Sequence, residues 1–110
     1  MGIGIKPPVI VDEHGSAMVF ESIDDAERYL EPIDIRNQEY VAYDSEGRLL
    51  RLIASDFQVT VEAVDLEPQH SSRVRELLVG LLEYTGVESS VLQGKSLQEL
   101  VESSLKYKTR

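Results

Sequence analysis

The chain has 110 residues, no cysteine, and a formal net charge of −9 from twenty acidic and eleven basic side chains. The length suits one domain over residues 1–110, and 42% apolar with 28% charged residues is typical of a globular protein. The absence of cysteine excludes disulfides and thiolate ligands and fits a reducing, cytoplasmic compartment. No apolar run approaches the roughly 20 residues of a membrane-spanning helix.

The beginning of the chain predicts a β-hairpin. Residues 1–8 are rich in glycine and proline, so we expect them to be flexible or loosely attached. Two short apolar runs, Val9–Val11 and Ala17–Phe20, follow and are expected to pair as antiparallel strands. The turn between them contains Gly15, which is free to adopt a positive φ.

A helix is predicted after this hairpin. Ser22 has the position of an N-cap, whose hydroxyl accepts a hydrogen bond from an amide two or three residues further on. Pro32 predicts that the helix ends near Leu30, because the residue before a proline avoids helical angles. A brief strand is expected at Ile33–Ile35.

The segment Glu39–Val64 has the alternation of apolar and polar residues that is typical of an antiparallel sheet. The turn Asp44–Gly47 divides it, and the strand Arg48–Ala54 that follows is apolar on both faces except at Arg51. This strand is therefore expected in the interior of the sheet, with its second face partly covered. In the last strand, Phe57–Ala63, every second residue is expected to face the core.

The end of the chain predicts two helices joined by an irregular or helical link. Pro68 suits the first turn of the first helix, which has a strong apolar stripe between Val74 and Leu82. Gly80 interrupts this stripe, so we expect another element to approach closely there. Gly86 is placed to end this helix, and Ser96 begins the second helix with a capping box.

These elements predict an α+β domain with the order β-β-α-β-β-β-α-α. We expect two layers: an antiparallel sheet of four to six strands, with two or three helices packed on one face.

The charge is distributed unevenly along the chain. Residues 21–46 contain nine acids and two bases, a net charge of −7, whereas residues 69–110 contain six bases and five acids, a net charge of +1. A negative surface repels nucleic acids and anionic lipids and attracts basic proteins. The candidate partner-binding residues are therefore the early acids and a neighbouring tyrosine: Glu21, Asp24, Asp25, Glu27, Glu31 and Tyr40. The alternative is that the charge only keeps the protein soluble.

Catalytic and metal-binding patterns are weak in this sequence. His14 and His70 are the only histidines, and both fall outside the predicted strands and helix interiors. A metal site needs several converging ligands, and a nucleophilic serine needs a neighbouring base. The adjacent Asp24 and Asp25 would point about 100° apart around a helix. We therefore expect no catalytic residues, no metal and no cofactor.

Two family resemblances follow from these patterns. The segment Tyr43–Leu49 resembles the tyrosine–aspartate hairpin of Rhs-type repeats, which indicates a turn at this place. The element order, small size and acidic balance resemble bacterial immunity proteins of polymorphic toxin systems. That resemblance implies a non-enzymatic protein that binds and inhibits a toxin through an acidic surface.

Three functional hypotheses remain. The first is a binding module that engages a basic protein through its early acids. The second is a small-molecule binder or enzyme with a pocket between sheet and helices. The third is a structural homodimer that uses the second face of the middle strand, including Leu49 and Ile53.

Overall fold

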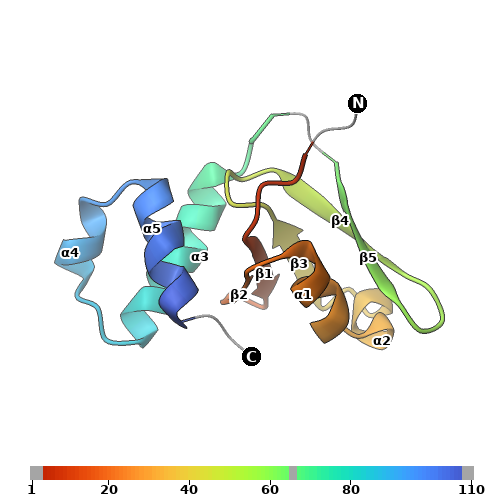
Figure 1. Cartoon of the computed structure of the whole chain (residues 1–110). Coiled ribbons are helices and arrows are strands. Elements are labelled where there is room, and N and C mark those ends of the chain that lie inside the picture. Colours follow the sequence, from red (N-terminus) through yellow and green to blue (C-terminus); the bar gives the residue numbers. More distant parts are fainter. Residues whose placement is uncertain (1–3, 65–66, 108–110) are drawn as a thin grey trace.

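The computed structural model describes residues 4–64 and 67–107 and has an α+β fold, as expected (Figure 1). Its antiparallel sheet has the strand order β2-β1-β3-β4-β5. The strands are β1 (Val9–Glu13), β2 (Ser16–Phe20), β3 (Tyr40–Tyr43), β4 (Leu49–Ala54) and β5 (Val59–Ala63). The described helices are α1 (Ile23–Tyr29), α2 (Pro32–Arg36), α3 (Ser71–Tyr84), α4 (Ser89–Gln93), α5 (Leu97–Ser104) and the 3-10 turn η1 (Leu105–Tyr107).

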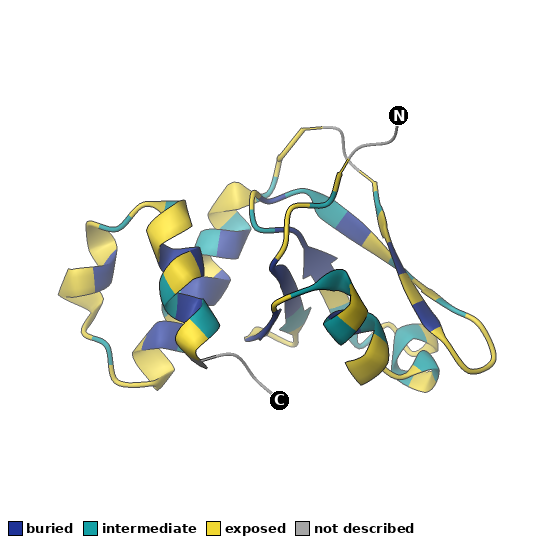
Figure 2. Cartoon of the chain, in the orientation of Figure 1, coloured by how far each residue is buried: buried dark blue, intermediate teal, exposed yellow. Residues whose placement is uncertain are grey.

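Helices cover both faces of the sheet, because the strand residues alternate between two apolar clusters. Ile10 belongs to the cluster that contains residues of α3, α4 and α5, whereas Val9 and Val11 belong to the cluster that contains α1. The expectation of helices on one face is therefore wrong. The reason is that β1 is apolar at three successive positions, so both of its faces can be buried. Figure 2 shows this buried centre and the exposed outer turns of the helices.

The helix after the first hairpin has the predicted limits. The Asp25 amide donates to Ser22 Oγ at 3.1 Å, and Leu30 is the C-cap. The brief strand expected at Ile33–Ile35 is wrong, because Pro32 begins the short helix α2 instead. A proline at the first helical position loses no hydrogen bond, since that amide has no intrahelical partner.

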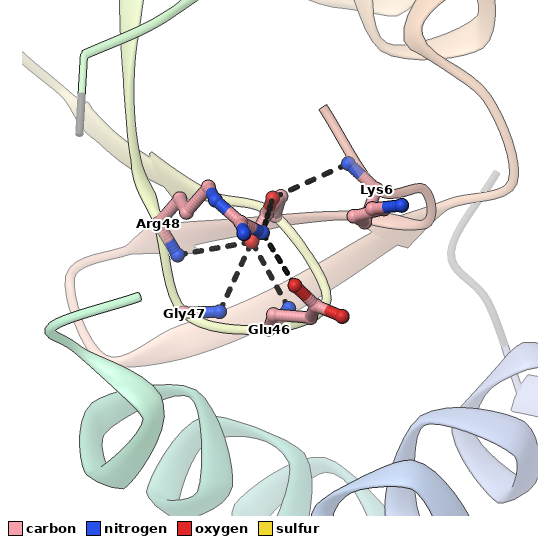
Figure 3. A network of polar contacts seen from close by, with 5 residues as sticks. Lys6, Glu46, Gly47 and Arg48 are labelled. Atoms are coloured by element: carbon pink, nitrogen blue, oxygen red, sulfur yellow. Dashed lines mark hydrogen bonds and ion pairs between the residues drawn. The ribbon is translucent and has the colours of Figure 1, made fainter. Parts of the chain in front are cut away.

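The turn between β3 and β4 is built around Asp44. Its fully buried Oδ1 accepts hydrogen bonds from the amides of Glu46, Gly47 and Arg48 at 3.0, 3.0 and 2.9 Å (Figure 3). The turn predicted at Asp44–Gly47 is thus confirmed, and β4 lies between β3 and β5 as an interior strand. Of the segment 1–8, residues 1–3 lie outside the described part, whereas the Lys6 carbonyl accepts from the Ser45 amide at 2.9 Å.

Phe57 does not belong to the last strand. Val59 and Val61 are buried as the alternation predicts, but β5 begins at Val59 and Phe57 is 90% exposed. Phe57 instead lies in the connection between β4 and β5, where the Ser55 amide donates to the Gln58 carbonyl at 2.9 Å. The expectation that Phe57 faces the core is therefore wrong, because Phe57 lies inside the turn, where the alternation of a strand does not apply.

The final helices follow the predicted pattern with two differences. Gly86 has a φ of +103° and ends α3, and Ser96 has both hydrogen bonds of a capping box. Pro68, however, precedes α3, which begins at Ser71. No described element approaches Gly80 closely: outside its own helix backbone and immediate neighbours, no described atom lies within 4 Å of a Cβ built there.

None of the helices formed by residues 4–64 and 67–107 is long and apolar enough to cross a membrane.

Candidate functional site

An open groove of about 530 Å³ lies between α1 and the hairpin of β4 and β5. We call it the α1–β5 groove. It is lined by Asp24, Glu27, Arg28 and Leu30 on one side and by Phe57, Gln58, Val59 and Thr60 on the other. Two of the predicted partner-binding residues, Asp24 and Glu27, therefore share one groove with the exposed aromatic ring of Phe57.

The geometry of α1 decides which acids line this groove. Ser22 fixes the start of the helix, and residues three or four positions apart lie on the same side of it. Asp24, Glu27 and Arg28 thus face the groove. Asp25 is rotated by about 100° from Asp24 and does not line the groove, although its Oδ1 lies 3.9 Å from Arg28 Nη2.

Glu27 is a structural residue as well as a groove residue. Its Oε2 accepts a hydrogen bond from the Val61 backbone amide at 2.8 Å. Because β5 is an edge strand, this amide points away from β4 and would otherwise be open to another chain. The Glu27 carboxylate therefore caps the sheet edge, and it is less free to bind a partner than Asp24.

The position of Phe57 is set by its hairpin and by α2. Arg36 of α2 donates from Nη2 to the Ser55 carbonyl at 2.7 Å, which ties the hairpin to the helix. Sequence reasoning missed Phe57 because the residue matches the core alternation. The turn residues Ser55 and Asp56 were the available signal, because the four-residue turn that they begin ends at Gln58 and includes Phe57.

The remaining candidates do not line the α1–β5 groove. Glu21 and Glu31 are exposed at the two ends of α1. Tyr40 lies on the sheet face of α1 and α2, and its hydroxyl donates to Asp34 Oδ2 at 3.2 Å. Burial, together with the negative charge of Asp34, raises the pKa of Tyr40 to about 12. Tyr40 is therefore held as a neutral donor to α2, away from the acids of α1.

A larger open groove, of about 880 Å³, lies between the segment before β1, the turn between β3 and β4, and helix α5. Its apolar lining comes from prolines before β1 and α3 and from Leu97, Val101 and Leu105. Lys6, Glu46 and Glu102 are the charged residues that line it. None of the candidate residues from the sequence contributes to this groove.

Each histidine outside these grooves lies beside another titratable side chain. His14 Nε2 lies 2.6 Å from Glu39 Oε1, and this carboxylate raises the pKa of His14. The ring of His70 packs 5.7 Å from that of Tyr43, whose pKa is raised by burial. In the part of the chain that the structure describes, no three His, Cys, Asp or Glu side chains are grouped so that they could hold a metal ion.

Comparisons of the chain with protein-family models, with curated proteins and with solved structures give no match.

Proposed function

We propose that the protein is a non-enzymatic binding module that receives a basic partner protein in the α1–β5 groove. The observation that supports this proposal is that Asp24 and the exposed ring of Phe57 line the same groove. In the immunity-type version of the proposal, the partner is a toxin whose basic surface is covered by this groove.

The chemistry of the groove suits an arginine side chain of the partner. A guanidinium group can stack on an aromatic face and at the same time pair with a carboxylate. Phe57 is 90% exposed and Asp24 is also exposed, so both groups are accessible to a partner. The net charge of −7 over residues 21–46 would increase the rate at which a basic protein arrives.

The test is the variant Asp24→Lys, with Glu102→Lys on α5 as the matched control. Both variants change the net charge by the same amount, but only Asp24 lines the α1–β5 groove. Glu27 is a poorer choice, because its reversal would also remove the hydrogen bond to Val61.

Binding would be measured with a labelled arginine-rich peptide, a lysine-rich peptide of equal length, and any toxin encoded beside the gene. We expect Asp24→Lys to weaken arginine-peptide binding about tenfold and to flatten its salt dependence, and Glu102→Lys to change it less. Phe57→Ala should weaken binding of the arginine peptide more than that of the lysine peptide. Equal affinities for Asp24→Lys and Glu102→Lys would contradict the proposal.

A second candidate function is binding of a small molecule in the 880 Å³ groove. Its lining, which combines apolar side chains with three charged residues, favours this alternative. A thermal-shift screen of metabolites would test it, because a ligand present at 100 times its dissociation constant stabilises a protein by about 2.7 kcal/mol. A shift that is lost in Glu102→Lys, at an exposed residue of this groove, and kept in Asp24→Lys would favour this groove over the α1–β5 groove.

A further inference from the structure

The part of the sheet formed by β3, β4 and β5 leaves one face largely uncovered. Tyr43 pairs with Leu49 in register, and both lie on the face that carries α3 and α5. Because side chains alternate along a strand, Arg51 and Ile53 share this face with Leu49. Figure 1 shows that α3, α4 and α5 lie toward one end of the sheet, away from the hairpin of β4 and β5.

We call this region the open sheet face. It is formed by Val41, Leu49, Arg51, Ile53, Glu62 and Val64. Leu49 is half-buried against the α3 cluster, but Val41, Ile53 and Val64 are 43%, 37% and 44% exposed. The face therefore presents to solvent apolar side chains from β3, from β4 and from the residue that follows β5.

Arg51 is unusual among the described arginines. Five of the six contact an acid or a carbonyl: Arg28, Arg36, Arg48, Arg73 and Arg75. The Arg51 guanidinium alone makes no hydrogen bond or ion pair with any residue in the ranges 4–64 and 67–107. Leu49 and Ile53 flank it on the same face of β4, so the exposed guanidinium lies between two apolar side chains. This composition is typical of the centre of a protein interface.

The charges of the open sheet face are complementary to themselves. Arg51 of β4 is in register with Glu62 of β5, and Glu62 also makes no ion pair with a described residue. Under a two-fold axis near this pair, Arg51 of each copy would meet Glu62 of the other. The charges of Arg51 and Glu62 cancel, so the open sheet face is neutral. Two copies would therefore not repel each other at this face, although each chain has a net charge of −9.

We propose that the open sheet face is the contact of a homodimer, in which two copies pack face to face through β3, β4 and β5. A second copy fits better than a strongly basic partner, because the face holds one base and one acid and is neutral. The proposal is independent of the α1–β5 groove, which involves α1 on the other face of the sheet.

The size of the face predicts a weak dimer. The six residues of β4 span about 20 Å, and the outer two of three strands about 4.8 Å apart lie about 10 Å from each other. This patch is smaller than the roughly 800 Å² per partner of a standard interface. We therefore expect a dissociation constant of about 10 to 100 μM.

Sedimentation velocity of the full chain, from about 1 to about 500 μM, measures the dissociation constant. We expect the mass to rise from 12.4 kDa toward twice that value. Ile53→Asp should remain monomeric throughout, and Arg51→Glu should weaken association about tenfold by placing two acids opposite each other. Arg28→Glu, which makes the same change of charge on α1, is the matched control and should dimerise nearly as wild type does.

The double variant Arg51→Glu with Glu62→Arg completes the test, because it restores the opposite charges between copies. We expect it to regain most of the lost affinity, with circular dichroism confirming that each variant is folded. The proposal is overturned by a wild-type chain that stays monomeric up to about 500 μM. It is equally overturned by a dimer that Ile53→Asp does not weaken or by a double variant no better than Arg51→Glu.

Discussion

Asp44 and Lys6 are joined by a hydrogen bond that links two segments 38 residues apart: the Lys6 amide donates to Asp44 Oδ2 at 3.2 Å. Arg48 Nη1 lies 3.2 Å from the same oxygen, so the second carboxylate oxygen contacts both a backbone donor and a cation. The side chain is fully buried, and both of its oxygens have partners. Asp44 therefore holds the segment before β1 against the turn that follows β3.

Replacement of Asp44 is expected to destabilise the fold strongly. Asp44→Ala would leave buried amides without an acceptor and Arg48 without its buried partner, which typically costs about 3 to 5 kcal/mol. Asp44→Asn keeps one acceptor and should cost about half as much. Urea denaturation measures both values, with Asp56→Ala in an exposed turn as the control. A loss below about 1 kcal/mol for Asp44→Ala would contradict the structural role.

Gly47 is expected to tolerate no side chain. It has a φ of +102°, and a Cβ added there would lie 2.7 Å from Ser71 Cα at the start of α3. Gly47→Ala thus combines backbone strain with a steric overlap and should cost about 3 kcal/mol or more. Gly15→Ala is the matched control, because its φ is +96° but a Cβ there meets no described atom within 4 Å. Equal losses for the two variants in urea denaturation would mean that the contact with α3 is unimportant.

Gly80→Ala is expected to stabilise the protein. Gly80 lies inside α3 and has open space beside it, so an alanine would meet no packing penalty. The gain should be about 1 kcal/mol, the difference in helix propensity between the two residues. Thermal unfolding would detect it as a higher Tm. A decrease in Tm would indicate that Gly80 is needed for a contact absent from the isolated chain.

The ion pair of His14 and Glu39 predicts a pH-dependent contribution to stability. The pKa of His14 is raised above its ordinary value by Glu39, so the folded chain binds this proton more tightly than the unfolded chain. The contribution is therefore complete below about pH 6.5 and is lost as pH rises through the raised pKa.

Glu39→Gln removes the cause of this shift, so its unfolding free energy should differ from wild type more at about pH 5.5 than at about pH 8.5. In an NMR titration, the pKa of His14 should fall in Glu39→Gln. A difference in stability that grows with rising pH would contradict the ion pair.

Glu27 is expected to protect the edge of β5. Glu27→Ala removes the acceptor of the Val61 amide and should cost about 1 to 2 kcal/mol, with faster hydrogen exchange at Val61. Glu31→Ala is the control, because Glu31 is exposed and makes no side-chain capping bond at α2. Unchanged exchange at Val61 in Glu27→Ala would show that another group protects the edge.

Much of the local structure could be predicted from short sequence patterns. Ser22, the turn at Asp44–Gly47, Gly86 and the capping box at Ser96 all behave as expected. Each depends on hydrogen bonds or backbone angles within about four residues, so the neighbouring sequence contains the necessary information. The α+β class followed from these elements, because their order and periodicity leave few other architectures.

The candidate site was predicted only in part. Asp24 and Glu27 were named from charge alone, and both line the α1–β5 groove, but Glu21, Asp25, Glu31 and Tyr40 do not. Phe57 was assigned to the core and is exposed. Charge clustering along a chain indicates a helix rich in acids, but it does not specify which side of the helix meets the sheet.

Short sequence patterns specify most of the turns and helix ends of this chain, because those features depend on residues close to each other along the sequence. The tertiary structure decided that α1 and α3 lie on opposite faces of the sheet, and that Glu27 reaches an amide 34 residues away. It also left Arg51 without a partner among the described residues. These outcomes depend on which apolar surfaces, distant in sequence, are buried against each other. That choice is made by the free energy of the whole molecule and not by any short segment.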